Sequence, residues 1–217
     1  MQGAFASFMI CGHTNKEKDT VLFIDPGFPV HKFQTKILGL KMESFDIYEY
    51  RGEKLREKLE SIFSTGKIHS VLYSNPNNPT WVCLTDEELK IIGELANKYD
   101  VIILEDLAYF GMDFRKDYSH PGVAPFQPTV GKYTDNYILM LSTSKAFSYA
   151  GERCAVLGIS NKLAERRYPD LKEFCGQEIF ARGIIFGALH PLSSGTSHSA
   201  QYAVAGVIKM YMLRVQT

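Results

Sequence analysis

Short apolar runs alternate with longer amphipathic segments along most of the chain. Each run is nearly continuous in aliphatic and aromatic residues, and several end at polar, Gly or Pro residues. Five such runs lie at residues 21–24, 71–73, 101–104, 137–141 and 155–159. Runs of this length are typical of strands covered on both faces, as in a mostly parallel sheet. We therefore predict five buried strands.

Helical patterns separate these strands. Residues 52–63 place aliphatic side chains on one face, with Lys and Glu elsewhere. Thr85 begins a second helix, because it can cap the first turn while Glu88 closes a capping box. Strand and helix alternation indicates an α/β doubly wound fold with a mostly parallel sheet. From about Asn161 onward the pattern predicts C-terminal helices, with a break at Ser193–Ser197.

Both ends of the chain interrupt a pattern. Met1 opens directly onto a helix-like Ala/Phe pattern, and residues 210–213 end in the middle of a helix. We therefore expect the chain to be truncated at both ends.

Composition narrows the class of protein. Hydrophobic residues make up 45% and charged residues 22%, with a formal net charge of +0. These values predict a soluble globular protein without a nucleic-acid or membrane partner. No apolar run approaches the roughly 20 residues that span a bilayer, and the start lacks the features of a secretory signal. Four distant cysteines favour reduced thiols and a cytoplasmic location, and six dispersed histidines predict no metal site.

The segment 141–153 has the first candidate chemistry. Lys145 follows a predicted buried strand, and a partly desolvated lysine can attack a carbonyl. Arg153 and the hydroxyls of Ser142 and Ser144 have the chemistry to bind a phosphate. A surface loop with a solvated lysine is the alternative, and this segment alone does not decide between them.

Two more segments follow predicted strands. Residues 74–80 contain two Asn-Pro steps, which favour a rigid turn because a residue before Pro avoids the α region. Such a turn suits an Asn that contacts a ligand, although an ordinary turn has the same pattern. Asp106 ends a buried strand, where an unpaired carboxylate is costly, so we expect a cationic partner. An Asp that caps a following helix is the simpler alternative.

Together the three segments resemble the fold-type I pyridoxal 5′-phosphate (PLP) enzymes, specifically the class I/II aminotransferase family. The family motifs are Asn-Pro-x-Asn-Pro-Thr-Gly, Asp-x-Ala-Tyr, and Ser-x-Ser-Lys with an Arg eight residues after the Lys. Here they match, in the same order, residues 75–80, 106–109, and 142–145 with Arg153. Phe28 and His31 match the family's aromatic that stacks on the cofactor and the His that supports the Asp, with core Phe28 and surface His31 as the alternative. Residues 1–4 resemble the end of its phosphate loop.

The resemblance implies a role for each matching residue. Lys145 would form a Schiff base with PLP and then act as the base at the substrate Cα, with Asp106 paired to the pyridine nitrogen. Asn78 and Tyr109 would donate to the phenolic oxygen, and Phe28 would stack on the ring. Phosphate contacts would come from Ser142, Ser144 and Arg153. The implied catalytic residues are thus Lys145, Asp106 and Tyr109.

The implied activity is PLP-dependent transfer of an amino group between an amino acid and a 2-oxo acid, in a homodimer. Residues 1–217 would form part of the PLP-binding large domain, with the small domain largely absent. Trp81 stands where the family turn has Gly, which alters the surroundings of the cofactor. Two alternatives remain open: another PLP reaction on the same fold, such as a lyase or decarboxylase, and a truncated, catalytically silent chain.

Overall fold

The computed structural model describes residues 1–118, 120 and 122–215, with only the backbone described from 211 to 215. The predicted large domain was assigned residues 1–217, so 119, 121, 216 and 217 lie outside the described residues. None of the described helices is long and apolar enough to cross a membrane.

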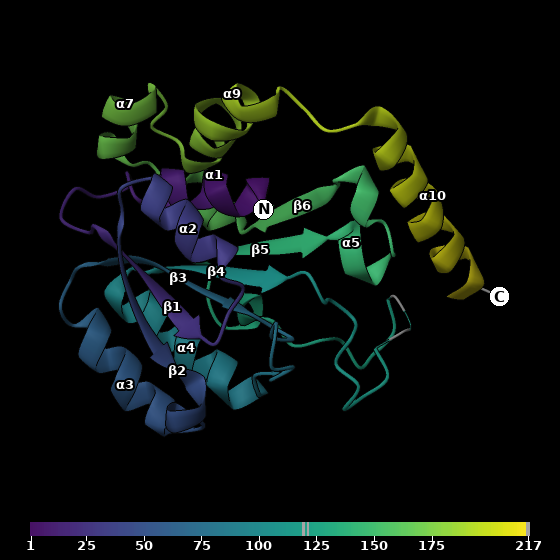
Figure 1. The fold of residues 1–217 in the computed structure, drawn as a ribbon, viewed down its shortest axis with the longest axis horizontal. Helices are drawn as coiled ribbons and strands as arrows, with labels where there is room; N and C mark the ends of the chain where they lie inside the picture. Colours follow the sequence, from purple (N-terminus) through teal and green to yellow (C-terminus); the bar gives the residue numbers. More distant parts are fainter. Residues whose placement is uncertain (119, 121, 216–217) are drawn as a thin grey trace.

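One six-stranded sheet forms the centre of the structure, with strand order β2-β1-β3-β4-β5-β6 (Figure 1). The first five strands in this order pair in parallel, and β6 runs antiparallel to β5. The strands are β1 (Thr20–Asp25), β2 (Lys41–Asp46), β3 (Ile68–Ser74), β4 (Ile102–Leu107), β5 (Tyr137–Ser142) and β6 (Ala155–Ile159). The predicted α/β fold with a mostly parallel sheet is confirmed.

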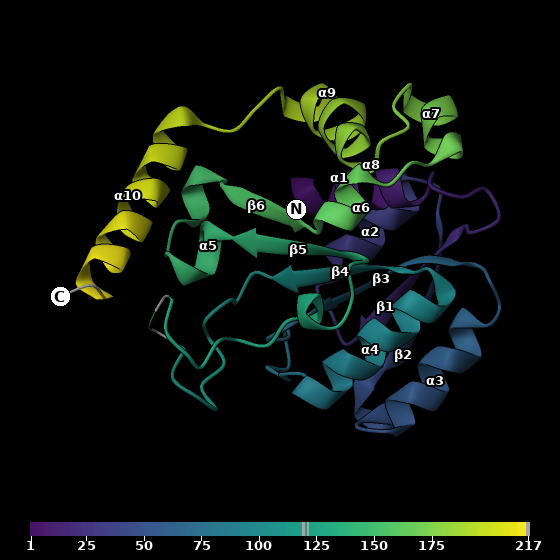
Figure 2. The same cartoon turned by 180° about the vertical axis from the view of Figure 1, so that it is seen from behind.

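Two helices cover one face of the sheet. They are α3 (Lys54–Phe63) and α4 (Asp86–Tyr99), and Figure 2 shows them side by side. Their buried aliphatic residues pack on Leu22, Val71 and Ile103 of the strands. Thr85 and Glu88 form the predicted capping box, which satisfies backbone N–H groups at the start of α4. A short 3₁₀ turn (η1, Ile47–Tyr50) leads into α3, and another (η2, Val130–Lys132) leads into β5.

The opposite face is covered mainly by α1 (Gln2–Cys11) and by helices from the C-terminal part of the chain (Figure 2). Phe8 and Ile10 of α1 pack with Leu104 and Ile138 of the sheet in a second core. The remaining elements are α2 (Val30–Ile37), α5 (Thr143–Ala146), η3 (Ala150–Glu152), α6 (Asn161–Glu165), α7 (Pro169–Cys175), α8 (Phe180–Arg182), a π-helical segment η4 (Gly183–Leu189), α9 (His190–Ser193) and α10 (His198–Val215). The predicted break therefore falls between α9 and α10.

The sequence interpretation was wrong at the two edges of the sheet. It missed β2, because five of the six residues of this edge strand are exposed and form no apolar run. It also predicted β6 as a buried strand, but Ala155 and Val156 are exposed. An edge strand has a neighbour on one side only, so its amino acid pattern differs from that of a central strand.

His69 on β3 makes the fold sensitive to acid. The residue is 1% exposed, and neither ring nitrogen has a hydrogen-bond partner among the described residues. Burial lowers the pKa of His69 from 6.5 to about 3. The folded state therefore keeps its full stability above pH 6.5 and loses stability as the pH falls towards 3, because the unfolded chain takes up a proton that the buried ring does not.

We expect His69→Leu to weaken the acid sensitivity of the protein. The free energy of unfolding of the wild type, relative to the variant, should fall by about 3 kcal/mol between pH 7 and pH 4. Urea denaturation at both pH values measures this difference. His120→Ala, at an exposed histidine, is the control and should keep the wild-type pH dependence. Equal pH dependence in His69→Leu and the wild type would contradict the assignment.

Candidate active site

A cleft of about 300 Å³ lies at the carboxyl edge of the parallel strands. Ligand sites of doubly wound sheets lie at this edge, because the loops after neighbouring strands meet there. The cleft is lined by all eight residues that the sequence singled out: Phe28, Asn78, Asp106, Tyr109, Ser142, Ser144, Lys145 and Arg153. The fold thus brings together residues that are up to 125 positions apart in the chain.

Asp106 is held by two hydrogen bonds at the end of β4. Its Oδ2 lies 3.2 Å from Nε2 of His31, and its Oδ1 accepts from the backbone N–H of Ala108 at 3.0 Å. His31 is 3% exposed in the first turn of α2, so it is not a surface residue. Asp106 therefore has a hydrogen-bond partner, which is a histidine from another element, whereas the expected positive charge of that partner stays a prediction.

Phe28 precedes α2 and keeps 37% of its surface exposed. Its ring meets the His31 ring edge to face, with the centroids 5.8 Å apart. Phe28 is therefore not a core residue, and it offers an aromatic face to the cleft.

Lys145 lies on α5, the single helical turn that follows β5. Its Nζ is 6.0 Å from the centroid of the Tyr109 ring. The expected partial burial of Lys145 is wrong, because the residue is exposed on a turn beyond the end of the sheet. The amine is therefore accessible from the cleft.

Ser142, Ser144 and Arg153 surround the start of α5. The Ser142 hydroxyl caps this turn by accepting from the backbone N–H of Ser144 at 3.2 Å. Arg153 is exposed, has a left-handed backbone (φ 54°) and donates from Nη1 to the Ala150 carbonyl at 2.6 Å. Among the described residues no carboxylate forms an ion pair with Arg153, so its guanidinium can meet an anion in the cleft.

The start of α1 borders the same cleft through Met1, Gly3 and Ala4. A second hollow, of about 580 Å³, adjoins it and is lined by Gly3, Arg153 and Thr196 among others. Thr196 belongs to the loop between α9 and α10. The residues that resemble a phosphate loop thus lie beside Arg153.

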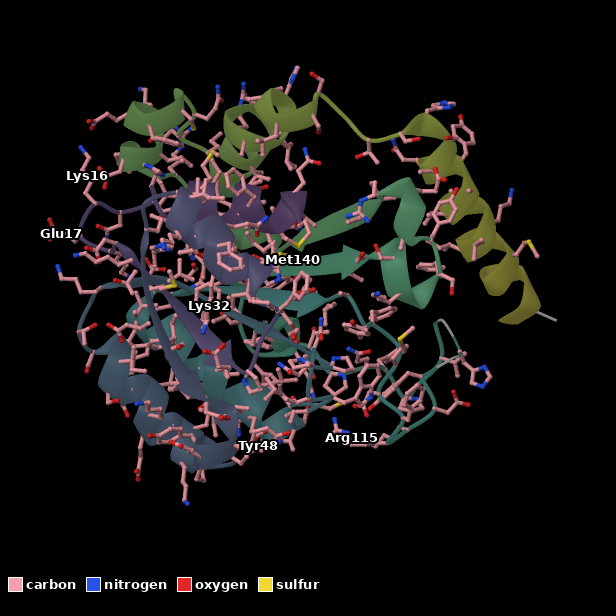
Figure 3. All side chains as sticks on the ribbon, viewed as in Figure 1. Lys16, Glu17, Lys32, Tyr48, Arg115 and Met140 are labelled. Atoms are coloured by element: carbon pink, nitrogen blue, oxygen red, sulfur yellow. The ribbon has the colours of Figure 1, made fainter. Side chains whose placement is uncertain are left out.

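Hydrogen bonds hold the loop that contains Asn78, both within the loop and to the segment after β1. The Asn78 backbone N–H donates to Ser74 Oγ at 3.2 Å, and the Asn77 side chain donates to the Pro26 carbonyl at 2.7 Å. Arg115, labelled in Figure 3, donates to the Leu84 carbonyl at 3.3 Å near the end of this loop. The two Asn-Pro steps therefore lie in an ordered turn, as the sequence predicted.

Trp81 has a left-handed backbone conformation (φ 60°), which explains why a glycine suits this position. Its ring packs edge to face on Tyr109, 5.2 Å between centroids, and stacks on Phe114 at 6.0 Å. Trp81 is not among the described residues that line the cleft, but its partner Tyr109 is.

Sequence reasoning missed several residues of the site. Met140 of β5, at the centre of Figure 3, lines the cleft with Val156 and Leu157 of β6. Val156 and Leu157 are consecutive on β6, so no alternation of side chains along the strand could have identified both. Glu105 was also missed, although a carboxylate inside an apolar strand is unusual. It is 0% exposed, and burial raises its pKa to about 7 against the effect of hydrogen bonds from Val130 and Asn75.

The cleft combines an accessible amine, a supported carboxylate, a guanidinium and an aromatic ring. This set suits an aromatic, anionic ligand that has a carbonyl group and a basic ring nitrogen. The amine can attach the carbonyl, the carboxylate can pair with the ring nitrogen, and the guanidinium can bind the anion.

Comparisons with known proteins agree with this chemistry. The family described as aminotransferase class I and II matches residues 3–209. The chain is 28% identical over 145 residues to a probable aspartate aminotransferase of Methanocaldococcus jannaschii, covering 67% of this chain and 36% of that protein. It is 25% identical over 174 residues to a cystathionine beta-lyase of Corynebacterium glutamicum, covering 80% of this chain and 44% of that protein.

Among solved structures, an aspartate aminotransferase of Thermotoga maritima has the same fold, with a TM-score of 0.70 at 20% identity. The match covers 100% of this chain and 52% of that one. The chain thus spans less than half the length of the two curated relatives above. Because the family match extends over nearly all of its residues, the chain belongs to the class I and II aminotransferases.

Proposed function

We propose that the protein is a PLP-dependent aminotransferase that moves an amino group between an amino acid and a 2-oxo acid. Membership of the family implies PLP as the cofactor. The observation that supports the proposal best is that Lys145, Asp106 and Arg153 line one cleft with the other five predicted residues. When bound, PLP supplies an electron sink for the substrate's Cα.

The residues of the cleft fit the groups of PLP. Lys145 would attach the aldehyde through Nζ and later hold the proton that leaves the substrate Cα. Asp106, oriented by His31, would pair with the pyridine nitrogen and keep its proton in place. Phe28 would stack on the ring.

Hydrogen-bond donors would hold the other edges of the cofactor. Asn78 and Tyr109 would donate to the phenolic oxygen, a contact that favours its anionic form. Ser142, Ser144 and Arg153 would bind the phosphate, with Arg153 as the charged contact.

We further propose that the chain is part of the PLP-binding large domain and that it works as a homodimer. The share of its relatives that it spans supports the first point. Exposed apolar residues on the C-terminal helices, Ile185, Phe186 and Tyr202, support the second. The cytoplasmic location remains a prediction of the sequence.

A lyase is the second candidate function, because one relative is a cystathionine beta-lyase that aligns with 80% of this chain. The residues of the cleft fit the cofactor and leave both reactions open, since one fold and one cofactor site serve several chemistries.

Lys145→Ala should abolish covalent attachment of PLP. After incubation with PLP and reduction with borohydride, the wild type should gain one cofactor, and peptide mapping should place it on Lys145. Lys162→Ala, at another exposed lysine of the chain, is the control and should be labelled like the wild type. Labelling of Lys145→Ala to the wild-type extent would overturn the assignment of the lysine.

Arg153→Met should weaken the binding of PLP by about tenfold to a hundredfold, because a charged hydrogen bond to the phosphate is lost. Pyridoxal, which lacks the phosphate, should bind the variant and the wild type equally. Fluorescence titration with both compounds measures the four affinities. An equal loss for PLP and pyridoxal would mean that Arg153 does not contact the phosphate.

The reaction itself is tested with the product of the complete gene. We expect transfer of the amino group from at least one of a panel of amino acids to a 2-oxo acid, followed by mass spectrometry of both products. Release of ammonia from cystathionine without a 2-oxo acceptor is the result expected of a lyase. That result would replace the first candidate with the second.

A further inference from the structure

Glu105 lies one residue before Asp106 on β4, and the two side chains point to opposite faces of the sheet. Asp106 contacts His31 on the side of α1 and α2. Glu105 lies among residues of the core under α4 and contacts Val130 and Asn75. Asp106 has a proposed role in binding PLP, whereas the buried carboxyl of Glu105 has none.

Both oxygens of Glu105 accept hydrogen bonds from loops at the carboxyl edge. Oε2 accepts from the backbone N–H of Val130 at 2.9 Å, and Oε1 accepts from the side-chain amide of Asn75 at 3.3 Å. Among the described residues, no lysine, arginine or histidine forms an ion pair with Glu105. The two donors are therefore the groups that compensate its burial.

Asn75 closes the loop that contains Asn78. Its Oδ1 accepts from the backbone N–H of Leu84 at 3.1 Å, which joins the two ends of the loop. Its own backbone N–H donates to the Asp106 carbonyl at 3.0 Å. The hydrogen bond from Asn75 to Glu105 thus attaches a closed loop to β4.

Val130, the first residue of η2, follows the second loop, which begins with Tyr109. The Gln127 side chain joins the two loops, because it donates to the Asn75 carbonyl at 3.1 Å and accepts from the Gly111 N–H at 2.6 Å. One buried carboxyl therefore contacts the first residue of the loop around Asn78 and the residue that follows the loop of Tyr109.

We infer that Glu105 is a positioning residue, which holds the loops of Asn78 and Tyr109 against β4 so that both can donate to the cofactor's phenolic oxygen. The inference rests on the proposed function, because it assigns these loops to the PLP site. Loops without regular structure are mobile unless hydrogen bonds attach them, and a site needs its donors within a fraction of an ångström.

Three variants separate this role from a general contribution to folding. Glu105→Leu removes both acceptors, and Glu105→Gln keeps one carbonyl oxygen for Val130. Gln127→Ala breaks the bridge between the loops without changing the core, so it remains informative where Glu105→Leu does not fold. Tyr73→Phe is the matched control. It removes a buried hydroxyl of β3, opposite Glu105, that makes no hydrogen bond among the described residues, so it changes the surroundings of Glu105 without breaking either loop contact.

The first measurement is hydrogen exchange of the protein without PLP. In Glu105→Leu, amides of residues 75–84 and 109–118 should exchange about tenfold faster, while those of α3 stay unchanged. Glu105→Gln and Gln127→Ala should give smaller changes in the same loops, and Tyr73→Phe none. Faster exchange over the whole chain, or no change in the loops, would overturn the inference.

The second measurement is the pH titration of the absorbance of the PLP-loaded protein. Loss of the donors to the phenolic oxygen should raise the midpoint on the order of one pH unit in Glu105→Leu. Asn78→Ala and Tyr109→Phe should shift it in the same direction, and Tyr73→Phe should leave it in place. A wild type that titrates while Glu105→Leu keeps its midpoint would overturn the inference alone. A wild type without a titrating band would overturn the proposed function and this role of Glu105 together.

Discussion

The parallel pairing of β1, β3, β4 and β5 is the constraint on which the site depends. Parallel strands end at the same edge of the sheet, so the segment after each strand begins beside the segment after its neighbour. Phe28 follows β1, Asn78 follows β3, Asp106 and Tyr109 come at the end of β4, and Lys145 follows β5. The two hydrophobic cores hold the strands in place. The segments that follow the strands are not needed for the cores, so their residues can line the cleft.

Two carboxyl groups at neighbouring positions of β4 have different surroundings, because their side chains point to opposite faces of the sheet. Asp106 keeps access to the cleft and is oriented by His31 and the Ala108 N–H. Glu105 is fully buried on the other face, where neutral donors from two loops are its contacts. Among the described residues no cation pairs with Glu105, so burial dominates and raises its pKa to about 7, whereas the partly exposed Asp106 faces the cleft. The difference arises from the alternation of side chains along a strand.

The family and the reaction are decided by different parts of such a protein. The cleft contains groups that fit PLP. The relatives of the chain include both a probable aspartate aminotransferase and a cystathionine beta-lyase. A shared cofactor site is expected for both, because the protein around the substrate selects which bond reacts. Trp81 is the clearest departure from the family pattern near the cleft. Its ring contacts Tyr109, which lines the cleft, and is partly exposed beside Phe114.

The sequence by itself determined the central strands, the capped helix α4 and eight of the residues that line the cleft. These features follow from local patterns: continuous apolar runs, the Thr85–Glu88 capping box and the ordered motifs. Local patterns can be recognised in the sequence alone. Only the tertiary structure decided the edges of the sheet, the exposure of Lys145, the burial of His31 and the contacts of Glu105. These features depend on which residues face each other across elements distant in the chain. Burial and hydrogen-bond partners are properties of that arrangement, and no single segment of the sequence contains them.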